Sequence, residues 1–431
     1  MSMRGFHHRV QQLSVSVLTV TACAAGAFAQ SPSNLADVRL DADQVRAVVA
    51  EMLADAQTRS SLLQSGAPAG HDGQFFLASP DGSFRLNISG QVQFRYMANF
   101  RNNEPGGDDF QPGFTTSRTA LRFDGNIYGP NLFYGLQANF RNDNGVFELE
   151  DAFAGYKFDN GFILMWGQAR EPILWEDVIS ETHALAVDQS VVNAVFGQGR
   201  THGVWTHYAA DNWRFWAGFN DGVRSANTDF GQAPADWGVT TRWEYKVAGD
   251  WSQFDTFASS RGSAYATKIG AGVHFEQSPD APGGAPGVID TFAWTGDIMS
   301  MGDGWTVFLA AVGFHTNLGD NRGSFDDFGF VAQGGYFITD DLDLFARYDI
   351  VLPDASRPGN KDFNTVTFGS NYYIHGQAAK VTLDVAWFLD DVADNDLVAG
   401  VAASRVGSAM GLLPSGKQNQ VAIRLQFQLL F

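Results

Sequence analysis

Cationic side chains stand at alternating positions along much of this 431-residue sequence. In "FRLNISGQVQFRY", residues 84–96, every second residue is polar, and Arg85 and Arg95 belong to the polar set. Successive side chains of a β-strand point to opposite faces, so this pattern predicts a strand with one apolar and one polar face. Guanidinium groups carry forked N–H donors that suit phosphate or carboxylate oxygens. The polar face is therefore a candidate surface for attracting anions.

The polar phase of the later strands repeats this arrangement, with more cations than acids. We assign to it the cations Arg85, Arg95, Arg118, Arg122, Arg141, Lys157, Arg170, Arg214, Arg242, Lys246, Lys268, Arg347, Lys380 and Arg424. The acids on the same phase are Asp124, Asp151, Glu244, Glu276, Asp297, Asp343, Asp349 and Asp384. Around a narrow aqueous passage with low-dielectric walls, such an excess of cations raises the local anion concentration. The alternative is that many of these cations pair with inward acids, as "RWEYK" at 242–246 suggests, and only complete a polar wall.

The segment 171–200 has the opposite charge. It contains the acids Glu171, Glu176, Asp177, Glu181 and Asp188 and the single cation Arg200. Pro172 ends the preceding strand pattern, and the segment is too long for an ordinary connection. Folded into a barrel, it would narrow the passage with acidic groups that repel phosphate. The alternative is a loop that only covers the outside.

No set of residues predicts catalysis, a metal site or a bound cofactor. His202 and His207 near Asp211 come closest to a catalytic set, but nothing else completes it. The stretches "LGDNRGSFDDF" and "DDVADND" lack a full calcium-loop pattern, and the nine histidines have no zinc spacing. We therefore predict that the protein is not an enzyme.

The elements that must position the cations are strands, because the apolar period is two almost throughout from Phe84 to Phe431. Short turn sequences at 129–131, 159–161, 209–212 and 339–341 alternate with long Gly-, Pro-, Asp- and Asn-rich loops. This asymmetry is typical of outer-membrane barrels, and it predicts an all-β, up-and-down antiparallel barrel of about 16 strands spanning 75–431. The last strand, "NQVAIRLQFQLLF", ends on Phe431, which looks like the signal read by the barrel assembly machinery.

The N-terminal region indicates export. Residues 1–29 combine Arg4 and Arg9, an apolar stretch and the small-x-small end "AFA", as a signal peptide does. The one cysteine, Cys23, lies within this region, where "VTAC" also resembles a lipoprotein cleavage box. Residues 30–74 predict a short amphipathic helix and a linker, which act either as a solvated spacer or as a short trimeric coiled coil. The net charge of −19 excludes nucleic acid as a partner.

Several stretches together resemble the phosphate-selective porin O and P family of outer-membrane porins. They are "FFLASPDGSFRLNISGQVQFRY", "MWGQAREPILWED", "GFVAQGGYFITDDLDLFARYD", "TFGSNYYIHGQAAKVTLDVAWF" and the closing "RLQFQLLF". The resemblance covers about residues 75–431 and implies a homotrimer whose third loop, here 171–200, folds into the barrel. It also implies phosphate as a solute, which the acidic 171–200 segment and the scarcity of lysine contradict.

These observations predict a porin in the outer membrane of a Gram-negative-type envelope that passively conducts small hydrophilic solutes and ions and weakly prefers anions. Its predicted partners are outer-membrane lipid, the assembly machinery and further copies of the chain. One alternative is an unselective or cation-preferring porin governed by the acidic segment. An alternative of another class is a structural protein whose N-terminal helix tethers the outer membrane to the cell wall.

Overall fold

The computed structural model describes residues 69–102, 109–140, 145–278, 289–319, 323–392, 397–398, 401–402 and 408–431. The predicted signal peptide, the predicted N-terminal helix and Arg141 lie outside these residues.

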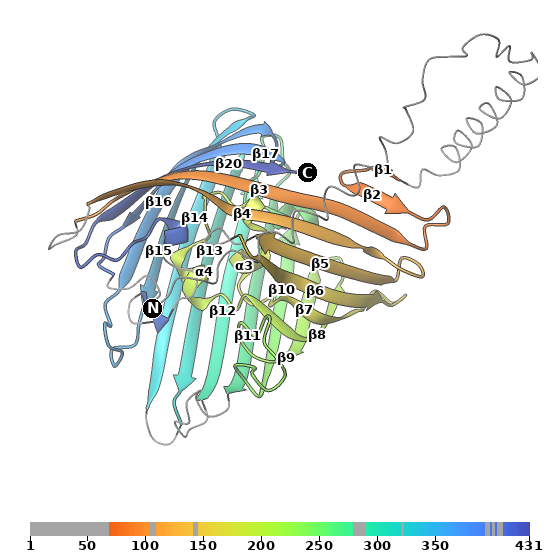
Figure 1. Ribbon diagram of the computed structural model, residues 1–431, viewed down its shortest axis with the longest axis horizontal. Helices are drawn as coiled ribbons and strands as arrows, with labels where there is room; N and C mark the ends of the chain where they lie inside the picture. The colour runs from red at the N-terminus through yellow and green to blue at the C-terminus, as the bar shows by residue number, and fades with distance from the viewer. Residues whose placement is uncertain are drawn as a thin grey trace, which may run out of the picture. The chain divides into compact units, whose positions relative to one another are not determined.

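Sixteen long strands form a closed antiparallel barrel within the described residues (Figure 1). They are β3 (Arg85–Phe100), β4 (Phe110–Asn126), β5 (Leu132–Phe140), β6 (Phe147–Lys157), β7 (Ile163–Arg170), β8 (Arg200–Ala209), β9 (Trp213–Asn220), β10 (Trp237–Ala248), β11 (Ala266–Ser278), β12 (Ile289–Gly302), β13 (Trp305–Asn317), β14 (Ser324–Phe337), β15 (Leu342–Leu352), β16 (Phe363–His375), β17 (Ala379–Phe388) and β20 (Gln420–Leu430). Each pairs with the next in this order, and β20 closes the ring against β3, where Phe427 lies opposite Phe94. The predicted barrel of about 16 strands is confirmed.

A short hairpin extends the seam between the first and last barrel strands. It consists of β1 (Ala69–His71) and β2 (Phe75–Ala78), and β2 pairs with the start of β3, Phe75 opposite Ile88. Farther along β3, the backbone groups of Gly90 and Phe431 exchange two hydrogen bonds. Among the described residues the sheet therefore extends back to Ala69, and the predicted domain boundary at residue 75 stays a prediction.

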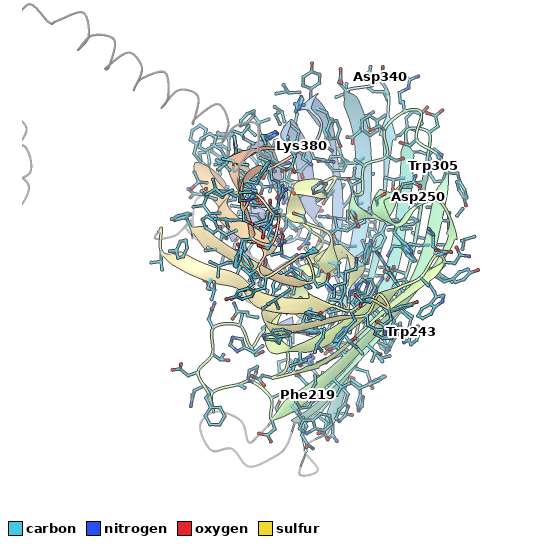
Figure 2. All side chains as sticks on the ribbon, turned by 90° about the vertical axis from the view of Figure 1, so that its right-hand side faces the viewer. Phe219, Trp243, Asp250, Trp305, Asp340 and Lys380 are labelled. Carbon is cyan, nitrogen blue, oxygen red and sulfur yellow. The ribbon has the colours of Figure 1, made fainter. Side chains whose placement is uncertain are left out.

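The two faces of the barrel wall differ as the alternation predicts. On β20, Ile423, Leu425 and Phe427 are exposed on the outside, whereas Arg424 and Gln426 are buried inside. Figure 2 labels two outward aromatic side chains, Phe219 and Trp243, and both are more than half exposed. An apolar outer surface of this kind meets the acyl chains of a bilayer, because closure satisfies all the strand hydrogen bonds inside the wall.

Besides the turn before β20, whose Ala409 and Met410 carbonyls accept hydrogen bonds from Arg95 and Arg424, at least two connections fold into the barrel. The first, residues 171–199 between β7 and β8, is called here the inner segment, and it contains α3 (Trp175–Val178), the 3₁₀ turn Glu181–His183 and α4 (Val191–Phe196). In Figure 1, α3 and α4 lie within the ring of strands. The second, residues 249–265 between β10 and β11, comes from the end that carries the short turns; its Phe254 and Phe257 are buried. The sequence pattern did not predict this second one.

The apolar side of α4 explains how the inner segment packs. Ser190 caps the helix by accepting a hydrogen bond from the Asn193 N–H. Phe196 then packs against the inward-facing Phe314 of β13, with ring centroids 5.2 Å apart. On β14, a Cβ added at Gly329 would lie 2.7 Å from Val192, so only glycine allows this close approach.

The remaining elements are small. They are the 3₁₀ turns Trp251–Asp255 and Ser408–Met410 and the two-residue strands β18 (Leu397–Val398) and β19 (Val401–Ala402). Among the described residues, no helix has the length and hydropathy needed to cross a membrane.

Candidate functional site

The inner segment is held by cations of the barrel wall. Arg347 donates to the carbonyl oxygens of Asp188 and Gln189 at 2.9 and 3.2 Å. From other strands, Lys380 donates to the Ala184 carbonyl at 2.9 Å, and Arg242 donates to the Ile173 carbonyl at 2.8 Å. Because these donors come from β10, β15 and β17, they hold the segment at several points of the wall.

Asp188 is the most heavily engaged acid of the inner segment. Its carboxylate lies 2.8 Å from the Arg95 Nη1, 2.7 Å from the Arg118 Nη2 and 3.5 Å from the Arg424 Nη1. Arg424 also pairs with Asp384 at 2.7 Å. Burial alone would raise the pKa of Asp188, but the three guanidinium groups lower it below its ordinary value.

The other four acids of the segment also have partners. Glu171 accepts from the Thr201 hydroxyl and the Trp205 indole, and Glu176 accepts from the Ser190 N–H at 2.7 Å. Asp177 accepts from the Gly199 N–H and lies 3.5 Å from Arg170. Glu181 forms an ion pair with Arg170 at 3.1 Å, and nearby Arg118 and Arg200 help to overcome the effect of burial, so the pKa of Glu181 is well below its usual range. Most of the segment's negative charge is therefore matched locally.

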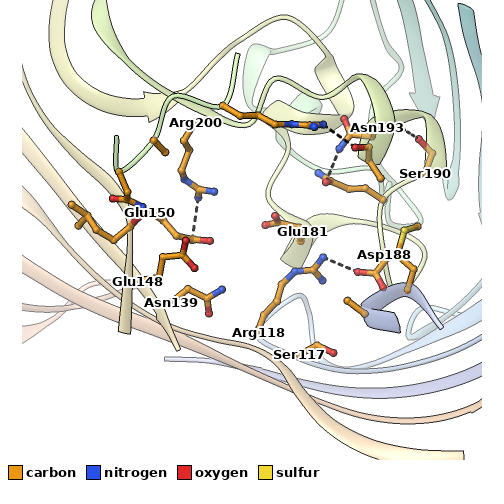
Figure 3. Close-up of a pocket in the computed structure, with 18 residues that line it drawn as sticks. Ser117, Arg118, Asn139, Glu148, Glu150, Glu181, Asp188, Ser190, Asn193 and Arg200 are labelled. Atoms are coloured by element: carbon orange, nitrogen blue, oxygen red, sulfur yellow. Dashed lines mark hydrogen bonds and ion pairs between the residues drawn. The ribbon is translucent and has the colours of Figure 1, made fainter. Parts of the chain in front are cut away.

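A cavity of about 490 Å³ remains between the inner segment and strands β4 to β6. Figure 3 shows Glu181, Arg118 and Asp188 across this cavity from Arg200 and Glu150. Arg200 spans two wall acids, with 2.7 Å to Asp151 and 3.1 Å to Glu150. Charges of both signs thus face the open space.

The structure places the predicted pore-lining cations in two groups. Those behind or beneath the inner segment are buried, namely Arg95, Arg242, Arg347, Lys380 and Arg424. Those beside the open space or toward the short-turn end are more accessible, namely Arg85, Arg118, Arg122 and Arg170. Arg122 has 48% of its side chain exposed, 3.3 Å from Asp124. Their roles in a pore stay predictions.

A buried charge cluster against α3 shows how Arg242 of the first group is neutralised together with Lys268. Glu244 lies 2.6 Å from both Arg242 and Lys268, and Arg242 also pairs with Asp297 at 2.7 Å. The Lys268 ammonium stands 3.2 Å from the centroid of the Trp175 ring. These cations therefore bind wall acids and an aromatic ring of the inner segment.

Two departures from strict alternation hid residues of the site. Glu150 is an extra residue in β6, where the pairing with β5 shifts between Gln137 and Ala138, so its side chain reaches the cavity out of phase. In β7, Met165 and Arg170 together line a second cavity, although alternation predicts opposite faces. The phase changes at Gly167, whose φ is 126°, so Met165 faces inward although alternation with Arg170 would place it outward.

The candidate catalytic and metal-binding residues do not converge. His207 stacks on Trp216, with ring centroids 4.6 Å apart, and the backbone N–H of His202 donates to Ser225. Within the part of the chain that the structure describes, no group of three or more His, Cys, Asp or Glu residues could hold a metal ion.

A closed 16-stranded barrel with an apolar outer surface, a polar inner surface and a segment folded inside defines an outer-membrane β-barrel porin. The family model for phosphate-selective porin O and P matches residues 86–429. The chain therefore belongs to this family.

Solved structures support the fold. An anion-selective porin from Comamonas acidovorans is similar with a TM-score of 0.58 and 12% identity, covering 80% of this chain and 99% of that one. The outer-membrane channel DcaP of Acinetobacter baumannii has a TM-score of 0.52 and 13% identity, covering 82% and 99%. OmpT of Vibrio cholerae in its trimer form has a TM-score of 0.51 and 13% identity, covering 80% and 98%. No curated protein matches the sequence.

Proposed function

We propose that this porin passes small hydrophilic solutes and ions passively beside the inner segment and weakly prefers anions. The observation that carries the proposal is the local matching of the segment's acids. Asp188 and Glu181 each face guanidinium groups, so the acidic segment does not present its full formal charge to a passing ion. Arg122 on β4 remains accessible, with 48% of its side chain exposed.

Strong selectivity for phosphate is not part of this proposal. A series of accessible lysines would favour phosphate, but Lys268 and Lys380 are buried, against Trp175 and the Ala184 carbonyl respectively. The alternative is an unselective or cation-preferring porin. Glu150 supports it, because this acid lies at the cavity beside Arg200 and offsets its positive charge.

The assembly that we propose is a homotrimer in the outer membrane. The similar OmpT structure in trimer form and the family membership support it. The alternative of a tethering protein depends on the N-terminal helix, which lies outside the described residues.

The test is the reversal potential of purified protein in planar bilayers under a salt gradient of potassium chloride. We expect open channels with a small reversal potential of the sign that marks chloride as the more permeant ion. A cation-signed reversal potential would support the acidic alternative, and the absence of channels would overturn the pore itself.

A further inference from the structure

Part of the inner wall is lined by aromatic side chains, where a porin lumen is expected to be polar. Phe133 and Phe153 on β5 and β6, Met165 on β7 and Trp205 on β8 line a cavity of about 310 Å³ together with Trp216 on β9. Pro172 and Val178 of the inner segment border the same cavity, which places it on the lumen side of the wall. This group of side chains and its cavity are called here the aromatic recess.

The aromatic recess also contains polar atoms. The His207 ring lines it, stacked on Trp216 at an interplanar angle of 15°, and its Nε2 atom is buried without a hydrogen-bond partner. Arg170 lines the recess as well, and it reaches from there to Glu181, which borders the larger cavity beside the inner segment. A guanidinium has five N–H donors, so Arg170 can engage a further acceptor.

Packing of the inner segment alone does not explain the recess. Protein interiors are filled at high density, and apolar side chains that only support a loop close around it. Here aromatic faces surround a volume large enough for a six-membered ring. Flat faces and a polar edge are the features by which proteins bind aromatic solutes, since stacked or edge-to-face rings attract each other beyond simple burial.

We infer that the aromatic recess is a subsite for small aromatic carboxylates on their way through the pore. The ring lies among Phe133, Phe153 and Trp216, and the carboxylate accepts hydrogen bonds from His207 and Arg170. This inference rests on the proposed function, because the solute reaches the recess only through an open channel.

The test is block of chloride current through the intact protein in planar bilayers by benzoate, acetate or cyclohexanecarboxylate at equal concentrations. We expect benzoate to reduce the current in a saturable way. Cyclohexanecarboxylate has the same charge and a similar size without a π face, and we expect it to bind more weakly; acetate should bind most weakly.

The matched variants are Trp216→Leu and Phe215→Leu. Trp216 lines the recess, whereas Phe215, its neighbour on β9, contacts the outward rings of Trp213 and Trp243. Loss of one stacking partner should raise the half-blocking concentration of benzoate about 2- to 10-fold in Trp216→Leu. Phe215→Leu should leave it unchanged.

The outcomes separate the two proposals. Equal block of wild-type protein by benzoate and acetate would overturn the subsite and leave the pore intact, and this comparison needs no variant to fold. Equal half-blocking concentrations in wild type and Trp216→Leu would also overturn it. A protein that carries no ion current would overturn the proposed function.

Discussion

Replacing Asp188 by Asn should release part of the inner segment from the wall. The carboxylate lies within 3.5 Å of three guanidinium groups, and its side chain is only 6% exposed. Asn keeps the shape but removes the charge, which leaves the buried Arg95 without its carboxylate partner. Breaking a buried ion pair in this way costs about 3 to 5 kcal/mol.

We expect this destabilisation to increase the movement of the inner segment and to leave the barrel itself folded. The segment keeps other anchors, including the bonds from Arg347 and Lys380 to its carbonyl oxygens. We therefore expect Asp188→Asn to give a larger and noisier single-channel conductance, a shift of the reversal potential toward anions, and a lower temperature for heat modification on SDS gels.

Asp124→Asn is the matched control, because it makes the same chemical change in an accessible pair. Asp124 lies 3.3 Å from Arg122, whose side chain is 48% exposed, and such pairs contribute about 0 to 1 kcal/mol. If both variants had the same heat modification and the same current noise, the role of Asp188 as an anchor would be refuted.

Three further predictions concern assembly, selectivity and pH. Deleting Phe431 should lower the yield of heat-modifiable protein, because its backbone closes the seam with Gly90; unchanged yield on gels would contradict this. Arg122→Gln should shift the reversal potential toward cations at low salt, where charges are less screened, and an unshifted value would remove Arg122 from the passage. The pKa values of Glu181 and Asp188 are lowered, so their contribution to stability is present above their ordinary pKa near 4 and is lost only as the pH falls below it. Conductance should therefore stay constant between pH 8 and pH 5, and a transition within that range would show that other groups control it.

The alternation of side chains was sufficient to predict the barrel because lipid and water impose it on every strand. β20 illustrates this, with Arg424 inside and Leu425 outside as the pattern requires. Alternation is a local property, and it fails where one residue is added. Glu150 is such a place, and at Gly167 the pattern fails because the backbone adopts a φ of 126°; neither has a sequence signature that separates it from a regular strand residue.

The inward folding of residues 249–265 could not be predicted for a different reason. Its hydrogen bond from the Phe257 N–H to the His183 carbonyl joins segments that are distant in sequence, and both lie inside the closed barrel. From the sequence alone, the segment that contains Phe254 and Phe257 looks like an ordinary loop, because nothing in it shows which part of the wall it contacts. Tertiary context alone decides whether such residues are buried.

The acids of the inner segment show why formal charge was a poor guide to the passage. A segment folded into a lumen lined by arginines needs acids to dock, since each wall cation it covers loses water and requires a partner. Asp188 meets this need for Arg95, and Glu176 lies 3.6 Å from Arg347. The charges that attach the segment are thus the ones withdrawn from the passage. Selectivity is then left to the side chains that the segment does not cover, which is why Arg122, with 48% of its side chain exposed, is the residue to change first.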